Sequence, residues 1–323
     1  MIGLWLWFSA ESQTQNKPAS SQNSSTASGQ LSAQASPSPE TAQTSASVAP
    51  AEGQSNNTIT VEQLLAALEA QAKENDPRAM LALGNLYERG INNNPKRNLG
   101  TALGWYQKAA ALEEPVAYFN VGTCYEVGLG TAPDQKKALD NFVKAADKGL
   151  AQAELKLASL YLNGQDVPLS IPKGMDYLTR AADQGFVQAL MELGAIEYYG
   201  LFEQPRDLTK ARDNFTKAAN VGEPVAMKNL AAMNIAGEGM EANRAQGLTW
   251  YLLAQQFGFN PPDLQTTIDD VKGGLKADEI SQAEKNAQDW ADKFKARVEA
   301  EQAINNAQAE AASTVGNASQ PAE

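Results

Sequence analysis

The chain has 323 residues, with 38 acidic and 26 basic side chains and a formal net charge of −12. Proteins that bind a phosphate backbone usually carry an excess of Lys and Arg. Because this chain has an excess of acids, neither nucleic acid nor an anionic membrane surface is an expected partner. The sequence contains no histidine, which excludes Ser-His-Asp, Cys-His and His-metal mechanisms. The single cysteine, Cys124, allows neither an intramolecular disulfide nor a thiolate zinc cage.

Residues 1–10 open with an almost wholly apolar stretch that runs from Ile2 to Phe8. This stretch is much shorter than the ~20 residues that span a bilayer, and no Lys or Arg precedes it as in a secretory signal. Trp5 and Trp7 suit the interface of a membrane with water. We expect residues 1–10 to be the remnant of a signal or membrane anchor. The alternative is a short hydrophobic tail with no targeting role.

Residues 11–57 are dominated by Ser, Thr, Ala, Gln, Asn and Pro, and Lys17 is their only base. Such a segment cannot bury enough apolar area to offset the entropy of ordering it, so we predict a disordered linker. A second low-complexity segment closes the chain, and we predict a disordered tail over residues 301–323. A Ser/Thr/Pro-rich linker behind an apolar N-terminus favours a folded domain that is held away from a membrane.

Residues 78–258 repeat one pattern five times, with each copy opening at an alanine: Ala79, Ala117, Ala153, Ala189 and Ala226. In every copy a Leu or Val follows four residues after the alanine, and a glycine follows eleven residues after it. Further along, an alanine pair recurs behind a large apolar residue, although the last pair is degraded; these residues are Tyr106, Phe142, Leu178, Phe215 and Tyr251. Each copy therefore predicts two amphipathic helices, the first of which ends at its glycine.

The pattern Ala-x-x-x-Leu-Gly-x-x-Tyr-x-x-Gly, a loop, then Lys-Ala-x-x-x-Tyr/Phe-x-Lys-Ala-Ala-x-x-Gly resembles the Sel1-like repeat, an α/α relative of the tetratricopeptide repeat. The resemblance implies an all-α fold: a right-handed α/α superhelical solenoid of about five repeats with helical caps, flanked by disordered termini. It also implies a non-enzymatic scaffold or adaptor that mediates protein–protein interactions.

Both flanks of the repeats are predicted to be caps, because the terminal units of a solenoid would otherwise expose their stacking faces. Residues 58–77 contain a capping box, Thr60 to Gln63, at the start of an expected helix. Residues 259–300 contain a helix that begins near Asp278 and carries apolar residues at helical spacing. A short coiled coil with a partner is the alternative for this last helix.

The resemblance further implies a bacterial protein of the cell envelope. We expect it to be periplasmic, or anchored in the inner membrane and facing the periplasm; the alternative is the cytoplasm. Some family members regulate a membrane sensor kinase or exopolysaccharide machinery, which is the narrower functional expectation. The expected partners are proteins of unknown identity, with no nucleic acid and with membrane contact only through an N-terminal anchor.

The first helix of each repeat has one face on which the repeats differ from one another, three, six and ten positions after the alanine. First helices line the inner wall of tetratricopeptide-like arrays, so this face is the candidate partner surface on the concave side. The alternative is an ordinary solvated face. The predicted partner-binding residues are Asn85, Arg89, Asn120, Thr123, Lys156, Ser159, Asn163, Glu192, Tyr199 and Asn229.

Three residues invite a chemical interpretation. Cys124 stands where the other repeats have Leu, Ile or Met, so we predict a buried small hydrophobe; a reactive or partner-linking thiol is the alternative. Ser170 and Lys173 have the Ser-x-x-Lys spacing of penicillin-binding enzymes, but the companion Ser-Asp-Asn and Lys-Thr-Gly motifs are absent. We predict no catalytic, cofactor-binding or metal-binding residue. The alternative function is a cell-wall or β-lactam-interacting enzyme that uses Ser170 and Lys173.

Overall fold

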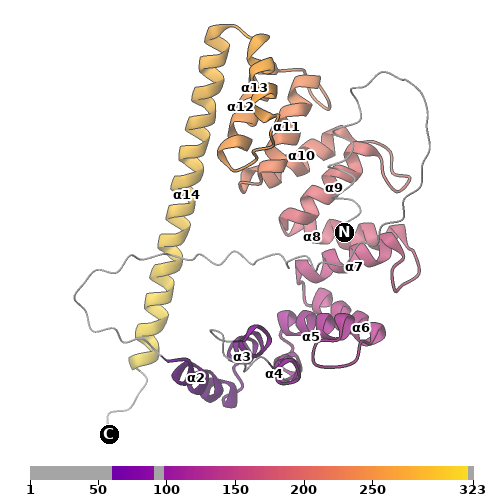
Figure 1. The fold of residues 1–323 in the computed structure, drawn as a ribbon, viewed down its shortest axis with the longest axis vertical. Helices are drawn as coiled ribbons and strands as arrows, with labels where there is room; N and C mark the ends of the chain where they lie inside the picture. Colours follow the sequence, from indigo (N-terminus) through magenta and orange to yellow (C-terminus); the bar gives the residue numbers. More distant parts are fainter. Residues whose placement is uncertain (1–59, 91–97, 319–323) are drawn as a thin grey trace, which may run out of the picture. The chain divides into compact units, whose positions relative to one another are not determined.

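The computed structural model describes residues 60–90 and 98–318 (Figure 1). The predicted N-terminal remnant (1–10) and linker (11–57) lie outside the described residues. Contacts divide the chain after Leu64, and the unit Leu65–Glu323 contains the repeats. All thirteen elements in the described part are α-helices: α2 (Val61–Lys73), α3 (Pro77–Arg89), α4 (Leu99–Ala111), α5 (Pro115–Val127), α6 (Gln135–Asp147), α7 (Ala151–Asn163), α8 (Ile171–Asp183), α9 (Val187–Tyr199), α10 (Leu208–Asn220), α11 (Pro224–Ala236), α12 (Arg244–Gln256), α13 (Leu264–Gly273) and α14 (Ala277–Ala318).

Ten of these helices form the five pairs that the sequence predicts, α3/α4 to α11/α12. The two helices of a pair pack most extensively against each other, and the second helix then packs on the first helix of the next pair. Figure 1 shows the pairs following one another in chain order from α3 to α12. The predicted all-α solenoid is confirmed.

Close approach within each pair depends on a small residue in the first helix. Ideal Cβ atoms at Gly122 and Gly194 would lie 2.7 and 2.8 Å from the rings of Phe142 and Phe215. These rings are 1% and 2% exposed, so they occupy the space that a methyl group would need. The glycine therefore sets the distance between the two helices, and the aromatic ring fills the interior.

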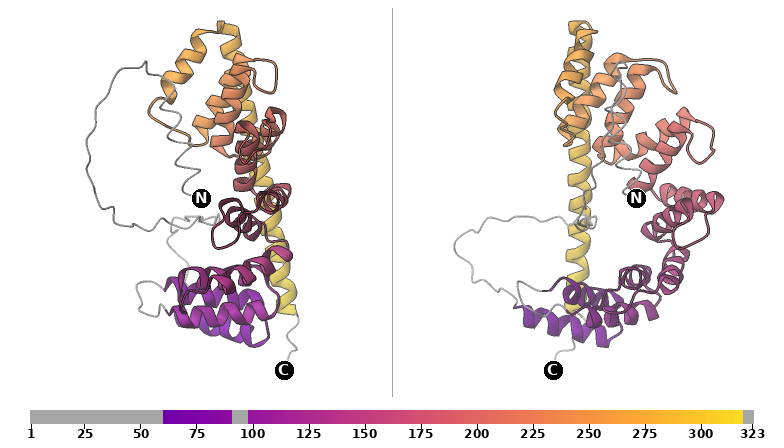
Figure 2. Two further views of the ribbon diagram at one scale, coloured as in Figure 1. Left: turned by 90° about the vertical axis from the view of Figure 1, so that its right-hand side faces the viewer. Right: turned by 45° about the vertical axis from the view of Figure 1, so that its right-hand side comes forward.

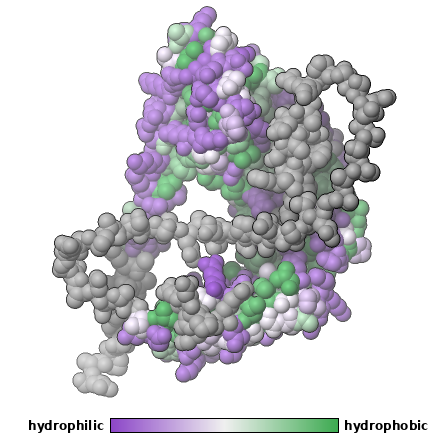
Figure 3. Space-filling model, in the orientation of Figure 1, coloured by the Kyte–Doolittle hydropathy of each residue, from purple (hydrophilic) through white to green (hydrophobic). Residues whose placement is uncertain are grey.

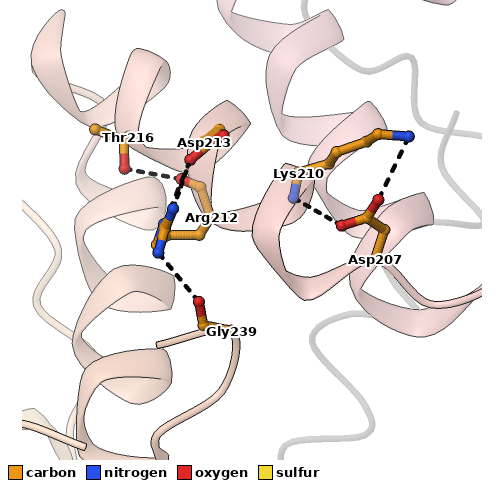
Figure 4. A network of polar contacts seen from close by, with 6 residues as sticks. All are labelled: Asp207, Lys210, Arg212, Asp213, Thr216 and Gly239. Atoms are coloured by element: carbon orange, nitrogen blue, oxygen red, sulfur yellow. Dashed lines mark hydrogen bonds and ion pairs between the residues drawn. The ribbon is translucent and has the colours of Figure 1, made fainter. Parts of the chain in front are cut away.

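The loop inside each repeat is closed by one recurring hydrogen bond. The residue that precedes the second helix donates its backbone N–H to a carbonyl in the last turn of the first helix, as Asp207 does to Glu197 O at 2.8 Å. Figure 4 shows that the Asp207 carboxylate also caps α10 by accepting from Lys210 N at 3.0 Å. In the same helix, Arg212 Nη1 donates to Gly239 O at 3.1 Å, which ties α10 to the loop of the following repeat.

One ion pair is buried between the two helices of the third repeat. Glu154, on α7, is only 2% exposed, and its carboxylate lies 2.7 Å from Arg180 Nη2 on α8. Gln184 Nε2 donates to the second oxygen of Glu154 at 2.6 Å, and Arg180 also donates to Ala146 O at 3.1 Å. Three helices, α6, α7 and α8, are thereby joined through the guanidinium group of Arg180.

The second helix of each repeat is followed by a residue with positive φ. It is Glu113 (φ 62°) in the first repeat and glycine in the others: Gly149, Gly185, Gly222 and Gly258. A side chain is disfavoured in this backbone region, so Glu113→Gly should raise the urea midpoint of unfolding, even though the exposed Glu113–Lys148 ion pair is lost.

Gly149→Ala is the matched reverse test. No atom lies within 4 Å of the ideal Cβ at Gly149, so only the backbone conformation, at φ 81°, opposes the methyl group. We expect a loss of about 1 kcal/mol in the free energy of unfolding, measured in the same urea titration. Equal stability of the wild type and both variants would show that this backbone region carries no strain here.

Cys124 lies in α5 and is 3% exposed, so its interpretation as a core residue is confirmed. Burial, with a smaller effect of the Glu88 charge, raises the pKa of the thiol to about 12. Because the thiolate is the reactive form, iodoacetamide at mildly alkaline pH should modify the native protein at least ~100-fold more slowly than the unfolded protein. Mass spectrometry of timed samples measures both rates, and similar rates would contradict the core assignment.

The N-terminal capping box is confirmed, because the N–H of Gln63 donates to Thr60 Oγ1 at 3.2 Å and the N–H of Thr60 donates to Gln63 Oε1 at 2.9 Å. At the other flank, α13 and the first half of α14 cover the fifth repeat, and α14 packs mainly on α12. Both views in Figure 2 show α14 as one uninterrupted helix.

Aromatic side chains join α14 to the repeats. The ring of Phe257 lies 5.6 Å from the ring of Trp290 and 5.0 Å from that of Phe294, both on α14. Arg297 Nη2 also donates to Asn220 O, at the end of α10, at 2.5 Å. The visible face of the fifth repeat with α13 and α14 is mostly hydrophilic in Figure 3, as expected when the apolar residues of these helices face inward.

The end of α14 differs from the predicted boundary. A tail was expected from residue 301, but the helix continues to Ala318. The physical reason is composition, because Ala, Glu and Gln in this stretch are strong helix formers even without apolar anchors.

Candidate protein-interaction surface

The ten predicted partner-binding residues all belong to first helices, namely α3, α5, α7, α9 and α11. We call their common side of the array the first-helix face. Its members differ in accessibility: Asn85, Arg89, Asn163 and Tyr199 are exposed, whereas Asn229 is only 8% exposed. The other five are half-buried: Asn120, Thr123, Lys156, Ser159 and Glu192.

In the first repeat, Asn85 is already engaged within the protein. The hydroxyl of Tyr106, on α4, donates to Asn85 Oδ1 at 2.8 Å and to Glu88 Oε2 at 2.6 Å. Burial of the hydroxyl and its bond to Glu88 raise the pKa of Tyr106. Asn85 therefore serves as a hydrogen-bond acceptor for a buried tyrosine hydroxyl.

In the second and third repeats, most polar side chains of the first-helix face bond to a neighbouring first helix or to their own helix. Lys156 Nζ lies 2.6 Å from Glu126 Oε1, an ion pair that joins α7 to α5. Thr123 Oγ1 donates to the carbonyl of Phe119 at 3.1 Å. Asn163 Nδ2 donates to Ser159 O at 2.8 Å and, more weakly, to Ser159 Oγ at 3.3 Å. The sequence analysis missed Glu126, whose relation to Lys156 depends on the stacking of two repeats.

The fourth and fifth repeats are different, because Glu192 and Asn229 on this face are desolvated and Asn229 also lacks one hydrogen bond. Burial raises the pKa of Glu192, on α9, and Gln188 Nε2 donates to its carboxylate at 3.2 Å. On α11, Asn229 Oδ1 accepts from Lys228 Nζ at 3.3 Å, but the buried Nδ2 of Asn229 has no hydrogen-bond acceptor. A buried unsatisfied donor costs about 1–3 kcal/mol, so this site is strained without a ligand.

Lys228 is a second group that the sequence analysis missed. It is half-buried, and desolvation lowers the pKa of its ammonium group. The available signal was compositional, since Lys228 is the single charged residue between Pro224 and Ala236. A single charge in an otherwise uncharged helix that packs against helices on both sides is costly to bury, so an ionic or hydrogen-bonding partner is expected for it.

Tyr199 presents an exposed aromatic ring at the end of α9. Its ring centroid lies 4.8 Å from that of Tyr198 in an edge-to-face arrangement. Tyr198 is itself held in place, because its hydroxyl donates to Glu238 and its carbonyl accepts from Arg206 Nε at 2.7 Å. Exposed tyrosine on a fixed support is typical of protein-binding surfaces.

Five stretches of the chain match the family model of the Sel1 repeat: residues 77–113, 115–150, 151–186, 187–223 and 224–254. Together they cover more than half of the chain. The chain belongs to the Sel1 repeat family. Sel1 repeats mediate protein–protein interactions, so the chain is a protein-interaction module of this kind.

The solved structure of a Sel1 repeat protein from Oxalobacter formigenes has the same fold. Its TM-score is 0.59 at 26% sequence identity, and the match covers 66% of this chain and 60% of that chain. The Sel1 repeat is therefore supported by structure as well as by sequence.

Two curated proteins are similar in sequence to part of this chain. Chitin synthase regulatory factor 3 of Schizosaccharomyces pombe is 29% identical over 132 residues, which are 39% of this chain and 14% of that protein. An uncharacterized protein of Neisseria meningitidis serogroup B is 31% identical over 172 residues, which are 53% of this chain and 35% of that protein. The chain thus spans about a third or less of these relatives.

The Ser170 and Lys173 pair has a structural place in the third Sel1 repeat. Ser170 precedes α8, and its backbone N–H closes the loop by donating to Tyr161 O at 2.9 Å. Lys173 Nζ lies 5.3 Å from the centroid of the Tyr161 ring. A shallow hollow of about 330 Å³ adjoins them, lined by Tyr161, Pro172, Lys173, Asp176 and Tyr177. Ser170 is also the N-cap residue of α8, a position at which serine is preferred without any catalytic role.

The described residues contain neither a candidate metal site nor a membrane-spanning helix. No three His, Cys, Asp or Glu side chains come together there as a metal-binding group. Among the helices of residues 60–90 and 98–318, none is long and apolar enough to cross a membrane.

Proposed function

We propose that this protein is a non-enzymatic adaptor that binds a partner protein on the first-helix face of its fourth and fifth Sel1 repeats. One observation carries the proposal: in the first three repeats many polar side chains of this face are paired internally, whereas α9 holds a desolvated carboxylate, Glu192, and α11 holds a buried amide N–H, that of Asn229, without an acceptor. Groups of this kind cost free energy in the unbound protein and regain it when a partner supplies the missing bonds.

Site-specific crosslinking tests this location. A photoreactive amino acid in place of Tyr199 should capture the partner in living cells, whereas the same residue in place of the exposed Lys217, on α10, should not. Mass spectrometry of the adducts identifies the partner. Capture from Lys217 but not from Tyr199 would place the interaction elsewhere and refute the proposed surface.

We further propose that the adaptor acts at the bacterial cell envelope, periplasmic or anchored in the inner membrane, and regulates a sensor kinase or exopolysaccharide machinery. The apolar start of the chain and its Ser/Thr/Pro-rich linker support an envelope location. The name of the fission yeast relative, which shares the repeats, refers to regulation of a polysaccharide synthase. Fractionation of cells that express the native gene tests the location, and recovery in the cytosol alone would refute it.

The rival function, an enzyme that uses Ser170 and Lys173, is tested by labelling with a fluorescent penicillin. The adaptor proposal expects no specific labelling of the wild type, because Lys173 lies against Tyr161 and Ser170 closes a loop. Labelling that disappears in Ser170→Ala would favour the enzyme instead.

A further inference from the structure

The neighbouring side chains of Lys228 and Asn229, in the middle of α11, form an unusual pair of donors. Lys228 Nζ donates to Asn229 Oδ1 at 3.3 Å, which orients the amide so that its Nδ2 is the atom without an acceptor. Asn229 is 8% exposed, so bulk water does not readily satisfy this Nδ2 group. The missing contact is therefore an acceptor that reaches a largely enclosed position.

Lys228 adds a positive charge beside that amide. Among the described residues, the ion pairs found do not include Lys228, and its only hydrogen bond found is the one to the amide oxygen. Two donors, an ammonium and an amide N–H, thus lie close together without an anionic partner. A neutral carbonyl would satisfy the amide but would leave the ammonium charge uncompensated.

The third repeat contains the complete version of this arrangement. There Lys156, which occupies the position of Asn229, is paired with Glu126 of the preceding repeat at 2.6 Å. The residue at the position of Glu126 in the fourth repeat is Tyr198, whose hydroxyl donates to Glu238. No carboxylate is therefore available from the equivalent position to complete the site on α11.

We infer that Lys228 and Asn229 bind a carboxylate group of the partner polypeptide. A carboxylate offers two oxygens, one for the ammonium and one for the amide N–H, and its single negative charge matches the single lysine. Phosphate, with up to two negative charges, fits less well. The position of α9 that is equivalent to Asn229 holds an acidic residue, Glu192, and the whole chain carries a net charge of −12, so a doubly charged anion is the less favourable ligand. This inference rests on the proposed function, since it names the chemistry recognised by the same surface.

The experiment follows the side-chain amide signal of Asn229 by nuclear magnetic resonance in the full chain. The probes are acetyl-tetra-alanine with a free C-terminal carboxylate, the same peptide with an amidated C-terminus, an amidated peptide with one Glu, and inorganic phosphate. A saturable shift with the free acid or the Glu peptide, absent with the amidated tetra-alanine, is the expected result. Comparison of the first and third probes distinguishes a terminal carboxylate from a side-chain carboxylate.

Two variants and one control make the assignment specific. Lys228→Met should weaken binding of the active peptide at least about 10-fold. Asn229→Asp should abolish it by supplying an internal carboxylate to Lys228, and because this variant has no side-chain amide, its binding is followed by the backbone amide signals of α11. Lys217→Met removes an exposed lysine from α10 and should leave binding unchanged. The amide fingerprint of each variant verifies its fold.

The inference is overturned if no peptide shifts the Asn229 signal into the millimolar range, if the amidated tetra-alanine or phosphate acts equally well, or if Lys228→Met binds like the wild type. Its failure is distinguishable from failure of the proposed function: crosslinking from Tyr199 that persists in Lys228→Met would retain the surface and discard only the carboxylate.

Discussion

Gly122→Ala should destabilise the protein by about 2 kcal/mol, although alanine is the better helix former. The added Cβ would lie 2.7 Å from Phe142 Cε1 and 3.2 Å from the carbonyl oxygen of Ala138, and neither atom can move freely. Phe142 is 1% exposed and closely surrounded, so the helices α5 and α6 would have to separate. Urea unfolding followed by circular dichroism measures the loss.

A control and a rescue separate this effect from a general intolerance of alanine. Gly104, inside α4, has no atom within 4 Å of its ideal Cβ, so Gly104→Ala should be neutral or stabilising by up to ~1 kcal/mol. The third repeat pairs Ala158 with Leu178, so adding Phe142→Leu to Gly122→Ala should restore the fit. A double-mutant cycle should give a coupling of about 1–2 kcal/mol. Additive losses would show that the clash with Phe142 is not the cause.

Arg180→Met should destabilise the protein by about 3 kcal/mol, because it leaves the Glu154 carboxylate buried without its cation. Only Gln184 Nε2 would remain bonded to that carboxylate. The reverse change, Glu154→Gln, should cost less, about 1 kcal/mol, since the Arg180 side chain is 40% exposed and water can solvate it. The order of the two losses is the informative result.

Two further variants test the interpretation of this pair. Replacing both partners, with Glu154→Leu and Arg180→Met together, should recover most of the stability, because no buried charge then remains. Lys148→Met breaks an exposed pair with Glu113 and should produce no measurable change. Hydrogen exchange of α7 and α8 locates the loss, which matters because repeat arrays can unfold in parts. If Arg180→Met equals Lys148→Met, Glu154 is not dependent on its cation.

Much of the fold was predictable because it depends on residues close together in the chain. The alanines, the helix-ending glycines and the large apolar residues recur at fixed spacing, so the helix pairs followed from local pattern alone. Glu113 follows the same backbone pattern although it is not a glycine, since it adopts the positive φ that the other repeats place on glycine at that position. The length of α14 did not follow, because an Ala- and Gln-rich segment has the composition of both a tail and a helix.

The candidate site was predictable only as a face. Spacing along a helix placed the ten residues on one side, but the partner of each side chain comes from another helix or another repeat. Glu126 lies 30 positions before Lys156, and Tyr106 lies 21 positions after Asn85. Only the stacked structure shows that these groups are paired while Asn229 Nδ2 is not.

The sequence by itself determined the class of this protein: a histidine-free, acidic chain that contains five Sel1 repeats, a module of protein interaction. This was sufficient because the helices, caps and core positions of each repeat depend on residues that are close together in the chain. The same apolar spacing therefore produces the same helix pair five times. Only the tertiary structure shows which polar groups of the described repeats lack a hydrogen-bond partner. Hydrogen bonding and desolvation depend on distances across repeats, and those distances desolvate Glu192 on α9 and leave Asn229 Nδ2 on α11 without an acceptor.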